Sequence, residues 1–161
     1  MISMDNLNTL LFVGGLTTIL FFVLVIGLYL LFVLGLYGLA KTERTGNEWF
    51  AFIPVLQLYI IGKILRELRA GSFTIPKLEL VLPLAPFAVM IVDKILSAIP
   101  AAGGLLSLLL NIVYIVFSIM ITYNFYKRYC GGKAAIMTVL SVIFFFMGPI
   151  YVFSMRDSKP L

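Results

Sequence analysis

The apolar positions of this chain fall into five runs, separated by short segments that carry almost all of the charge. The runs cover residues 10–40, 50–61, 80–99, 105–126 and 134–155. A helix needs about 20 apolar residues to cross the hydrocarbon core of a bilayer, and four of the runs reach that length. The run at 50–61 contains Pro54 and would extend only about 18 Å as a helix. The pattern predicts an all-α, polytopic helical membrane protein with about four transmembrane helices plus one short re-entrant or interfacial segment.

The first run predicts a transmembrane helix and not a signal peptide. Residues 1–8 contain no Lys or Arg, and the apolar stretch that follows runs on to Ala40. Signal peptides have a basic N-terminal region and an apolar stretch of about 7–15 residues. As one helix, residues 10–40 would be about 46 Å long. We therefore expect this helix to tilt, to break near Gly14-Gly15, or to project beyond the bilayer.

Composition agrees with a membrane protein. Hydrophobic residues make up 62% of the 161 residues and charged residues only 12%, against about 25% charged residues in soluble domains. The excess lies in uninterrupted runs, which indicates lipid-facing surface. Since no linker-like segment interrupts the chain, residues 1–161 are expected to form a single integral membrane domain.

Basic residues lie in two of the loops and predict the orientation. They are Lys63, Arg66, Arg69 and Lys77 in the first of these loops, and Lys127, Arg128 and Lys133 in the second. The loop at 98–104 has no charge, so the positive-inside rule places both basic loops in the cytoplasm and the neutral loop outside. The N-terminus is outside if residues 50–61 re-enter, and inside if they span. The N-terminal segment lacks Lys and Arg, whereas Lys41 and Arg44 follow the first run, which favours the re-entrant version.

The two halves of the chain share a weak internal similarity. Each has a long apolar run, a short basic loop and a Pro-interrupted apolar segment that ends in a cation. The first such segment contains Pro54 and ends at Lys63, and the second contains Pro149 and ends at Arg156. Interrupted segments in corresponding halves can indicate a transporter binding site. Pro and Gly are also tolerated in membrane helices, and this simpler interpretation is favoured.

Small and polar residues form a stripe along the run at 105–126. Its members are Gly104, Ser107, Asn111, Tyr114, Ser118 and Thr122. Their spacings of three and four place them on one helical face. The favoured interpretation is a packing face, because small residues allow close approach of helices and polar side chains form hydrogen bonds across them. The alternative is the lining of a path for a polar substrate.

Asp93 and Lys94 are the charges that lie well inside a predicted span. A charge at a helix centre costs about 2.5–3.5 kcal/mol on insertion scales, although Lys94 can extend toward the interface. With Ser107, Asn111 and Ser118 they form the candidate intramembrane polar site. Local neutralisation of Asp93 by Lys94 is favoured over a functional role, which would be coordination of an ion or proton or pairing with Asn111.

The sequence contains few residues of the kinds that catalyse reactions. The chain has no histidine and a single cysteine, Cys130, which excludes Ser-His-Asp catalysis, HExxH metal sites and an internal disulfide. Glu43, Glu48, Glu67 and Glu79 could converge in the fold, but we expect them to be solvated loop charges. We predict no catalytic, cofactor-binding or metal-binding residues. The net charge of +5 does not indicate a nucleic-acid partner, because the cations flank membrane segments.

Residues 49–59 form the pattern W-x-x-x-I-P-x-x-x-x-Y. This segment resembles one found after the first transmembrane helix in small multi-spanning bacterial membrane proteins of unknown function. Residues 126–129, which lead into an apolar segment with Gly-Pro-Ile at 148–150, resemble the later part of those proteins. Many members have Asn at the position of Gln57, which is a departure. The resemblance implies a multi-pass protein of the bacterial inner (plasma) membrane and implies no activity.

These features predict a non-enzymatic integral membrane protein that acts as an accessory or regulatory subunit of a bacterial envelope or transport assembly. The alternative is a small homo-oligomeric transporter or pore-forming protein, and an intramembrane enzyme acting on lipid comes third. The expected partners are the lipid bilayer and either other membrane proteins or further copies of the chain.

The orientation can be tested at Cys130, the only thiol in the sequence. Because it lies in a basic loop predicted to be cytoplasmic, a membrane-impermeant maleimide should label it only after cells are opened. Cys130→Ser is the control for background labelling. Labelling of Cys130 in intact cells would invert the predicted orientation.

Overall fold

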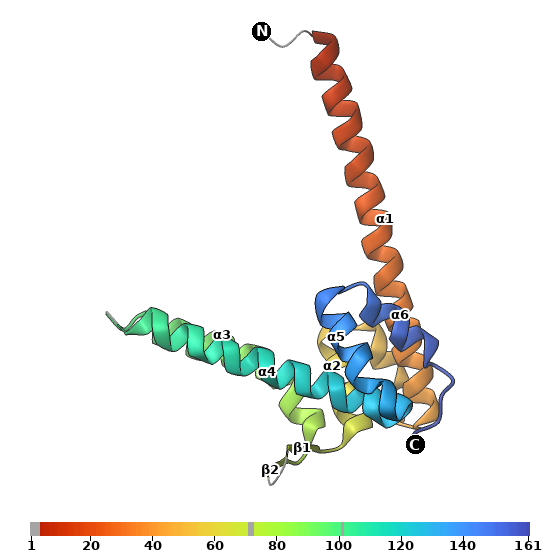
Figure 1. Cartoon of the computed structure of the whole chain (residues 1–161), viewed down its shortest axis with the longest axis vertical. Helices are drawn as coiled ribbons and strands as arrows, with labels where there is room; N and C mark the ends of the chain where they lie inside the picture. The colour runs from red at the N-terminus through yellow and green to blue at the C-terminus, as the bar shows by residue number, and fades with distance from the viewer. Residues whose placement is uncertain (1–3, 71–72, 101) are drawn as a thin grey trace.

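The computed structural model describes residues 4–70, 73–100 and 102–161, which are mostly helical (Figure 1). The elements are α1 (Met4–Thr42), η1 (Glu48–Phe52), α2 (Pro54–Leu65), β1 (Leu68–Ala70), β2 (Phe73–Ile75), α3 (Leu78–Ser97), α4 (Gly103–Cys130), η2 (Gly131–Lys133), α5 (Ala134–Ile143) and α6 (Met147–Ser154). The short helices gather in one cluster, from which α1 and the α3–α4 hairpin diverge (Figure 1). The antiparallel ribbon of β1 and β2 lies in a loop for which the sequence predicted no strand.

Three segments among the described residues are long and apolar enough to cross a membrane. They are Leu11–Thr42, Leu78–Ser97 and Gly103–Ile143. The predicted helical membrane fold is confirmed at this level, and α1 continues without a break at Gly14-Gly15.

The count of four transmembrane helices is not confirmed, because residues 134–155 do not form one helix. They form α5, with 10 residues, and α6, with 8 residues. Pro149 lies in the first turn of α6, where its missing N–H removes no helical hydrogen bond. The chain turns back between Ile143 and Met147, before Pro149, whereas α3 continues past Pro83 and Pro86.

The expected short segment is a helical hairpin, η1 with α2, which we call the first hairpin. Tyr29 Oη donates a hydrogen bond of 2.9 Å to the carbonyl of Phe52. The end of η1 therefore lies beside α1 at a point about 20 Å from the end of α1 at Thr42. The chain then returns through α2, since Lys63 lines the same cavity as Arg44. The hairpin thus begins and ends at one end of the molecule.

Helices α5 and α6 form a second hairpin at the same end. Gly35 lies against Val152 and Phe153, and Gly38 lies against Arg156, so α6 runs alongside the last turns of α1 in the same direction. The N–H of Leu161 then donates to the carbonyl of Arg128. The weak similarity of the two halves therefore corresponds to a long helix followed by a short hairpin in each.

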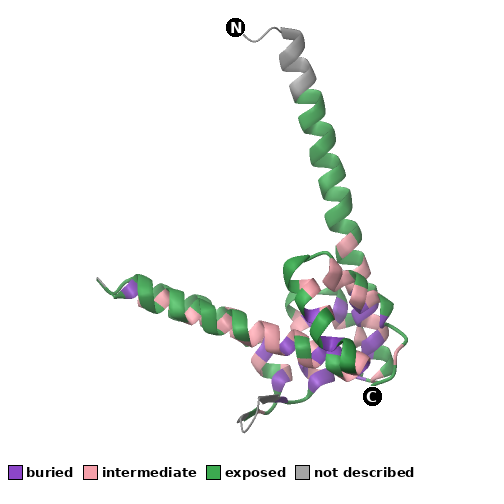
Figure 2. Ribbon diagram, viewed as in Figure 1, coloured by how far each residue is buried: buried purple, intermediate pink, exposed green. Residues whose placement is uncertain are grey.

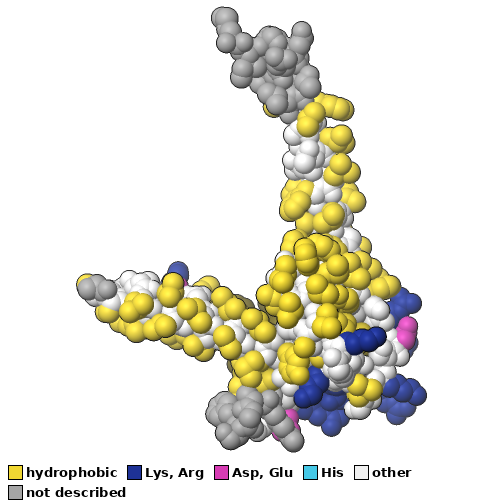
Figure 3. Space-filling model, viewed as in Figure 1, with side chains coloured by type: hydrophobic (Ala, Val, Ile, Leu, Met, Phe, Trp, Pro, Cys, Tyr) yellow, Lys and Arg dark blue, Asp and Glu magenta, His cyan; other side chains and the backbone are white. Residues whose placement is uncertain are grey.

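Cations mark the end of the molecule where both hairpins begin, which we call the basic end. They lie in the last turns of α1, α2 and α4 and at the start of α3, and Figure 3 shows them gathered around the helical cluster. The hydrophobic core lies beside them (Figure 2). Its fully buried side chains include Leu36, Leu39, Ile60, Ile64, Leu78 and Tyr126.

The parts of the long helices that leave the core are exposed, and we call them the two arms (residues 11–30 of α1, and residues 84–116 of α3 and α4). Large apolar side chains on both arms are largely exposed, such as Phe12 at 72% and Val113 at 65%. A helix that is apolar all round suits a membrane environment.

Glycines allow the closest helix contacts in the core. A Cβ added to Gly35 would lie 2.6 Å from the backbone nitrogen of Phe153, and one added to Gly62 would collide with the carbonyl of Leu78. Small residues at such crossings let backbones approach each other, which favours association of helices in lipid.

We expect Gly35→Ala to lower the free energy of unfolding in detergent by about 1–3 kcal/mol, because α6 must move away from α1. Gly27→Ala on the same helix is the matched control, since nothing lies within 4 Å of its added Cβ. Thermal unfolding followed by circular dichroism measures both variants. Equal effects of the two substitutions would contradict this packing of α6 on α1.

Candidate functional site

The α3–α4 hairpin brings together three of the five residues of the predicted polar site. Ser107 Oγ donates a hydrogen bond of 2.5 Å to Asp93 Oδ1, and Asn111 Nδ2 donates one of 3.0 Å to the same oxygen. Within the described part of the chain, Lys94 is exposed and lies outside this network, and Ser118 Oγ donates to the carbonyl of Tyr114. The carboxylate is therefore stabilised by hydrogen bonds from α4, which include the pairing with Asn111 named among the alternatives.

The polar stripe of α4 has two different surroundings. Toward the neutral loop, Ser107 and Asn111 form hydrogen bonds across to α3, as expected for a packing face. Closer to the core, Tyr114, Ser118 and Thr122 line a cavity of about 160 Å³ together with residues of α2 and α3. The stripe thus packs helices at one end and borders a small void at the other.

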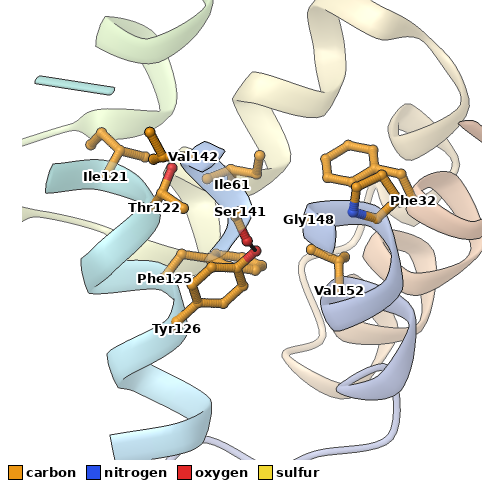
Figure 4. Close-up of a pocket in the computed structure, with 11 residues that line it drawn as sticks. Phe32, Ile61, Ile121, Thr122, Phe125, Tyr126, Ser141, Val142, Gly148 and Val152 are labelled. Carbon is orange, nitrogen blue, oxygen red and sulfur yellow. Dashed lines mark hydrogen bonds between the residues drawn. The ribbon is translucent and has the colours of Figure 1, made fainter. Parts of the chain in front are cut away.

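A larger cavity of about 260 Å³ lies between the two hairpins (Figure 4). Side chains from five helices surround it: Phe32 of α1, Ile61 of α2, Thr122, Phe125 and Tyr126 of α4, Ser141 and Val142 of α5, and Gly148, Pro149 and Val152 of α6, with Ile121 completing the lining. Sequence reasoning had singled out Thr122, Gly148 and Pro149 but had not placed them together.

The polar groups of this cavity are hydroxyls. Tyr126 Oη and Ser141 Oγ share a hydrogen bond of 2.9 Å, and Thr122 donates to the carbonyl of Ser118 in its own helix. Two hydroxyls joined by one hydrogen bond retain one O–H that can donate elsewhere. An apolar cavity of about 150 Å³ can hold benzene, so this cavity can accept an apolar group with one weak hydrogen-bond acceptor. Its lining includes no Asp, Glu, Lys or Arg.

An ion pair at the basic end joins the two halves of the chain. Arg128 Nε and Nη2 donate to the two carboxylate oxygens of Glu43 at 2.9 Å each, and Tyr129 Oη donates to Glu43 Oε1 at 3.2 Å. The Glu43 side chain is only 8% exposed. The expectation that Glu43 is a solvated loop charge was therefore wrong. A contact between residues 85 positions apart leaves no local signal in the sequence.

Comparisons with protein-family models, curated proteins and solved structures find no match to this chain. Among the described residues, no three His, Cys, Asp or Glu side chains gather in a way that could hold a metal ion. The functional interpretation therefore depends on the geometry of the chain itself.

Asn111→Leu tests the network around Asp93. We expect the free energy of unfolding in detergent to fall by about 0.6–2 kcal/mol, because a hydrogen bond between α3 and α4 is lost. The matched control is Asn124→Leu on the same helix, since the amide of Asn124 donates to the carbonyl of Met120 within α4. Unchanged stability combined with loss of function in cells would indicate that the stripe lines a path instead of packing helices.

Proposed function

We propose that this chain is a non-enzymatic integral membrane protein that serves as an accessory or regulatory subunit of a bacterial envelope or transport assembly. The observation that carries the proposal is the exposed apolar surface of the two arms. Phe22 on α1 is 59% exposed, and Ile95 on α3 is 63% exposed. In a bilayer such surfaces contact either lipid or other membrane helices, and a subunit needs surface of this kind to join an assembly.

The core supports a non-enzymatic role. The hydroxyls of Tyr126 and Ser141 share a hydrogen bond in a cavity whose lining holds no acid or base. To activate a hydroxyl as a nucleophile, an enzyme places an acid or base side chain beside it. The carboxylate of Glu43 is already held by Arg128 and Tyr129, which leaves it poorly placed to act on a substrate.

The membrane arrangement that we propose has three spans with the N-terminus outside. Lys41, Lys63 and Lys127 lie in the last turns of their helices at one end of the molecule, and the positive-inside rule supports placing that end in the cytoplasm. Both short hairpins then re-enter from the cytoplasmic side. The bacterial inner (plasma) membrane is proposed from the resemblance of residues 49–59 alone.

A second candidate function is a small homo-oligomeric transporter. It is favoured by the two short hairpins, which carry Pro54 and Pro149 at the start of their returning helices and border the 260 Å³ cavity. Interrupted segments of this kind, meeting between the two halves of a chain, form binding sites in known transporter folds.

Photo-crosslinking in cells distinguishes the two functions. A photoreactive amino acid replaces Phe22 or Val113 on the arms, and the matched control places it at Leu36, which is fully buried. We expect the arm positions, and not Leu36, to crosslink to one distinct membrane protein, followed by co-purification in mild detergent with a mass above that of the chain alone. Crosslinks solely between copies of the chain would favour the transporter, and crosslinks solely to lipid would overturn the accessory role.

A further inference from the structure

A polar cavity of about 300 Å³ lies at the basic end, apart from the cavity between the hairpins. It is lined by Glu43, Arg44, Thr45, Lys63, Arg66 and Glu79. These residues come from the turn after α1, the end of α2 and the first turn of α3. Three separate parts of the chain therefore contribute polar residues to the border of one space.

Arg66 occupies a backbone conformation that favours glycine. Its φ of 64° and ψ of −56°, with the N–H of Glu67 donating to the carbonyl of Leu65 at 2.8 Å, form the rare, strained type of γ-turn. The turn is held because the Arg66 N–H donates to Gly62, and the Arg66 carbonyl accepts from Leu78. Strained residues of this kind concentrate at functional sites.

Arg44, which also lines the cavity, likewise has a positive φ. Its φ is 52°, again in the left-handed region, although a glycine follows only two residues later at Gly46. Among the described residues, the non-glycine residues with positive φ are Arg44, Arg66 and Lys77, all of them cations at the basic end. The chain keeps charged side chains where glycine would avoid the strain.

Thr45 supplies a hydroxyl that is free to bind. The residue is 8% exposed, and its Oγ1 atom has no hydrogen-bond partner among the described residues. Buried hydroxyls almost always have a partner, so one without calls for an explanation such as a bound group. An anionic oxygen in the cavity would accept a hydrogen bond from this hydroxyl.

The charges around the cavity are positive in sum. Arg44, Lys63 and Arg66 face the carboxylates of Glu43 and Glu79. Arg128, which lies outside this lining, already donates two hydrogen bonds to Glu43. The three cations therefore exceed the one remaining carboxylate, and an anion would relieve their mutual repulsion.

We propose that this cavity binds a phosphate group. Arg66 and Arg44 would contact its oxygens through their guanidinium groups, with Lys63 as a third charge and the Thr45 hydroxyl as a neutral donor. A phosphate ester can come from the headgroup of an anionic phospholipid or from a small soluble phosphoester. The two sources present the same chemistry to these residues.

The experiment measures binding to the purified full chain in a neutral detergent. Native mass spectrometry is used with dioleoylphosphatidylglycerol and with dioleoylglycerol, which lacks the phosphate. A thermal-shift titration with glycerol 1-phosphate tests the soluble source. Binding of the phospholipid alone assigns the site to a lipid headgroup, whereas stabilisation by glycerol 1-phosphate assigns it to a soluble phosphoester. Equal binding of the two lipids, together with no shift by glycerol 1-phosphate, overturns the proposal.

Substitutions locate the binding in this cavity. Arg66→Gln should weaken binding of the phosphate-bearing probe by about tenfold or more, the loss of a charge-assisted hydrogen bond. Thr45→Val removes the hydroxyl and keeps the shape, and should weaken binding by a smaller factor. The matched control is Lys133→Gln, an exposed cation of the same end that lies outside the lining. The proposal is overturned if Arg66→Gln and Thr45→Val weaken binding of the probe no more than Lys133→Gln does. If Arg66→Gln fails to fold, Thr45→Val alone decides the test.

Arg66→Gly separates binding from folding. Glycine adopts the backbone angles of this turn without strain, so the variant should unfold at a higher temperature while it binds the phosphate-bearing probe more weakly. A merely structural arginine would not show these opposite changes. If the variant is more stable and binds the probe as well as the unmodified chain, the arginine serves another purpose and the proposal fails.

Discussion

The arrangement of this chain depends on one constraint, that backbone N–H and C=O groups in a bilayer must find their hydrogen-bond partners within the protein. Helices α1 and α4 meet it along their length, and α3 meets it except at Pro83 and Pro86, which lie inside the helix and donate no hydrogen bond. The turns at Ile53 and at Phe144–Phe146 interrupt helices and need cover from neighbouring helices. The first hairpin packs against α1 and α3 and the second against α1 and α4, all at the basic end. The core is therefore concentrated there, and the arms stay largely exposed.

A similar constraint applies to the ion pair of Glu43 and Arg128. A buried carboxylate is expensive unless its oxygens are hydrogen-bonded, and Glu43 receives three such bonds from Arg128 and Tyr129. The pair joins the turn after α1 to the last turn of α4, and so connects the two halves where each long helix gives way to its hairpin. It contributes chiefly by fixing the relative position of those ends, because its Coulomb energy is offset by desolvation.

Sequence patterns predicted the features that depend on local composition. The spans predicted at 80–99 and 105–126 agree with α3 and α4. A long apolar segment in a bilayer forms a helix because a helix satisfies its backbone hydrogen bonds within the segment. The grouping of Ser107 and Asn111 on one face followed from helical periodicity. The bond between Tyr126 and Ser141, the Glu43–Arg128 pair and the γ-turn at Arg66 could not be predicted, since they depend on distant contacts or on backbone angles that no residue pattern specifies. The interruption of residues 134–155 at Gly148-Pro149 was visible in the sequence. The length of the apolar run nevertheless favoured one span, and no residue pattern specified two helices folded back on each other.

The unequal distribution of helices along the molecule has a consequence for the surrounding bilayer. At the basic end, parts of α1, α2, α3, α4, α5 and α6 lie in one cluster, whereas α1 and the α3–α4 hairpin alone extend away from it (Figure 1). In the three-span arrangement proposed above, the cluster lies in the cytoplasmic leaflet, and the molecule would displace more lipid from that leaflet than from the opposite one. Many copies in one patch would create an area difference between the leaflets, and membrane curvature would partly relax it.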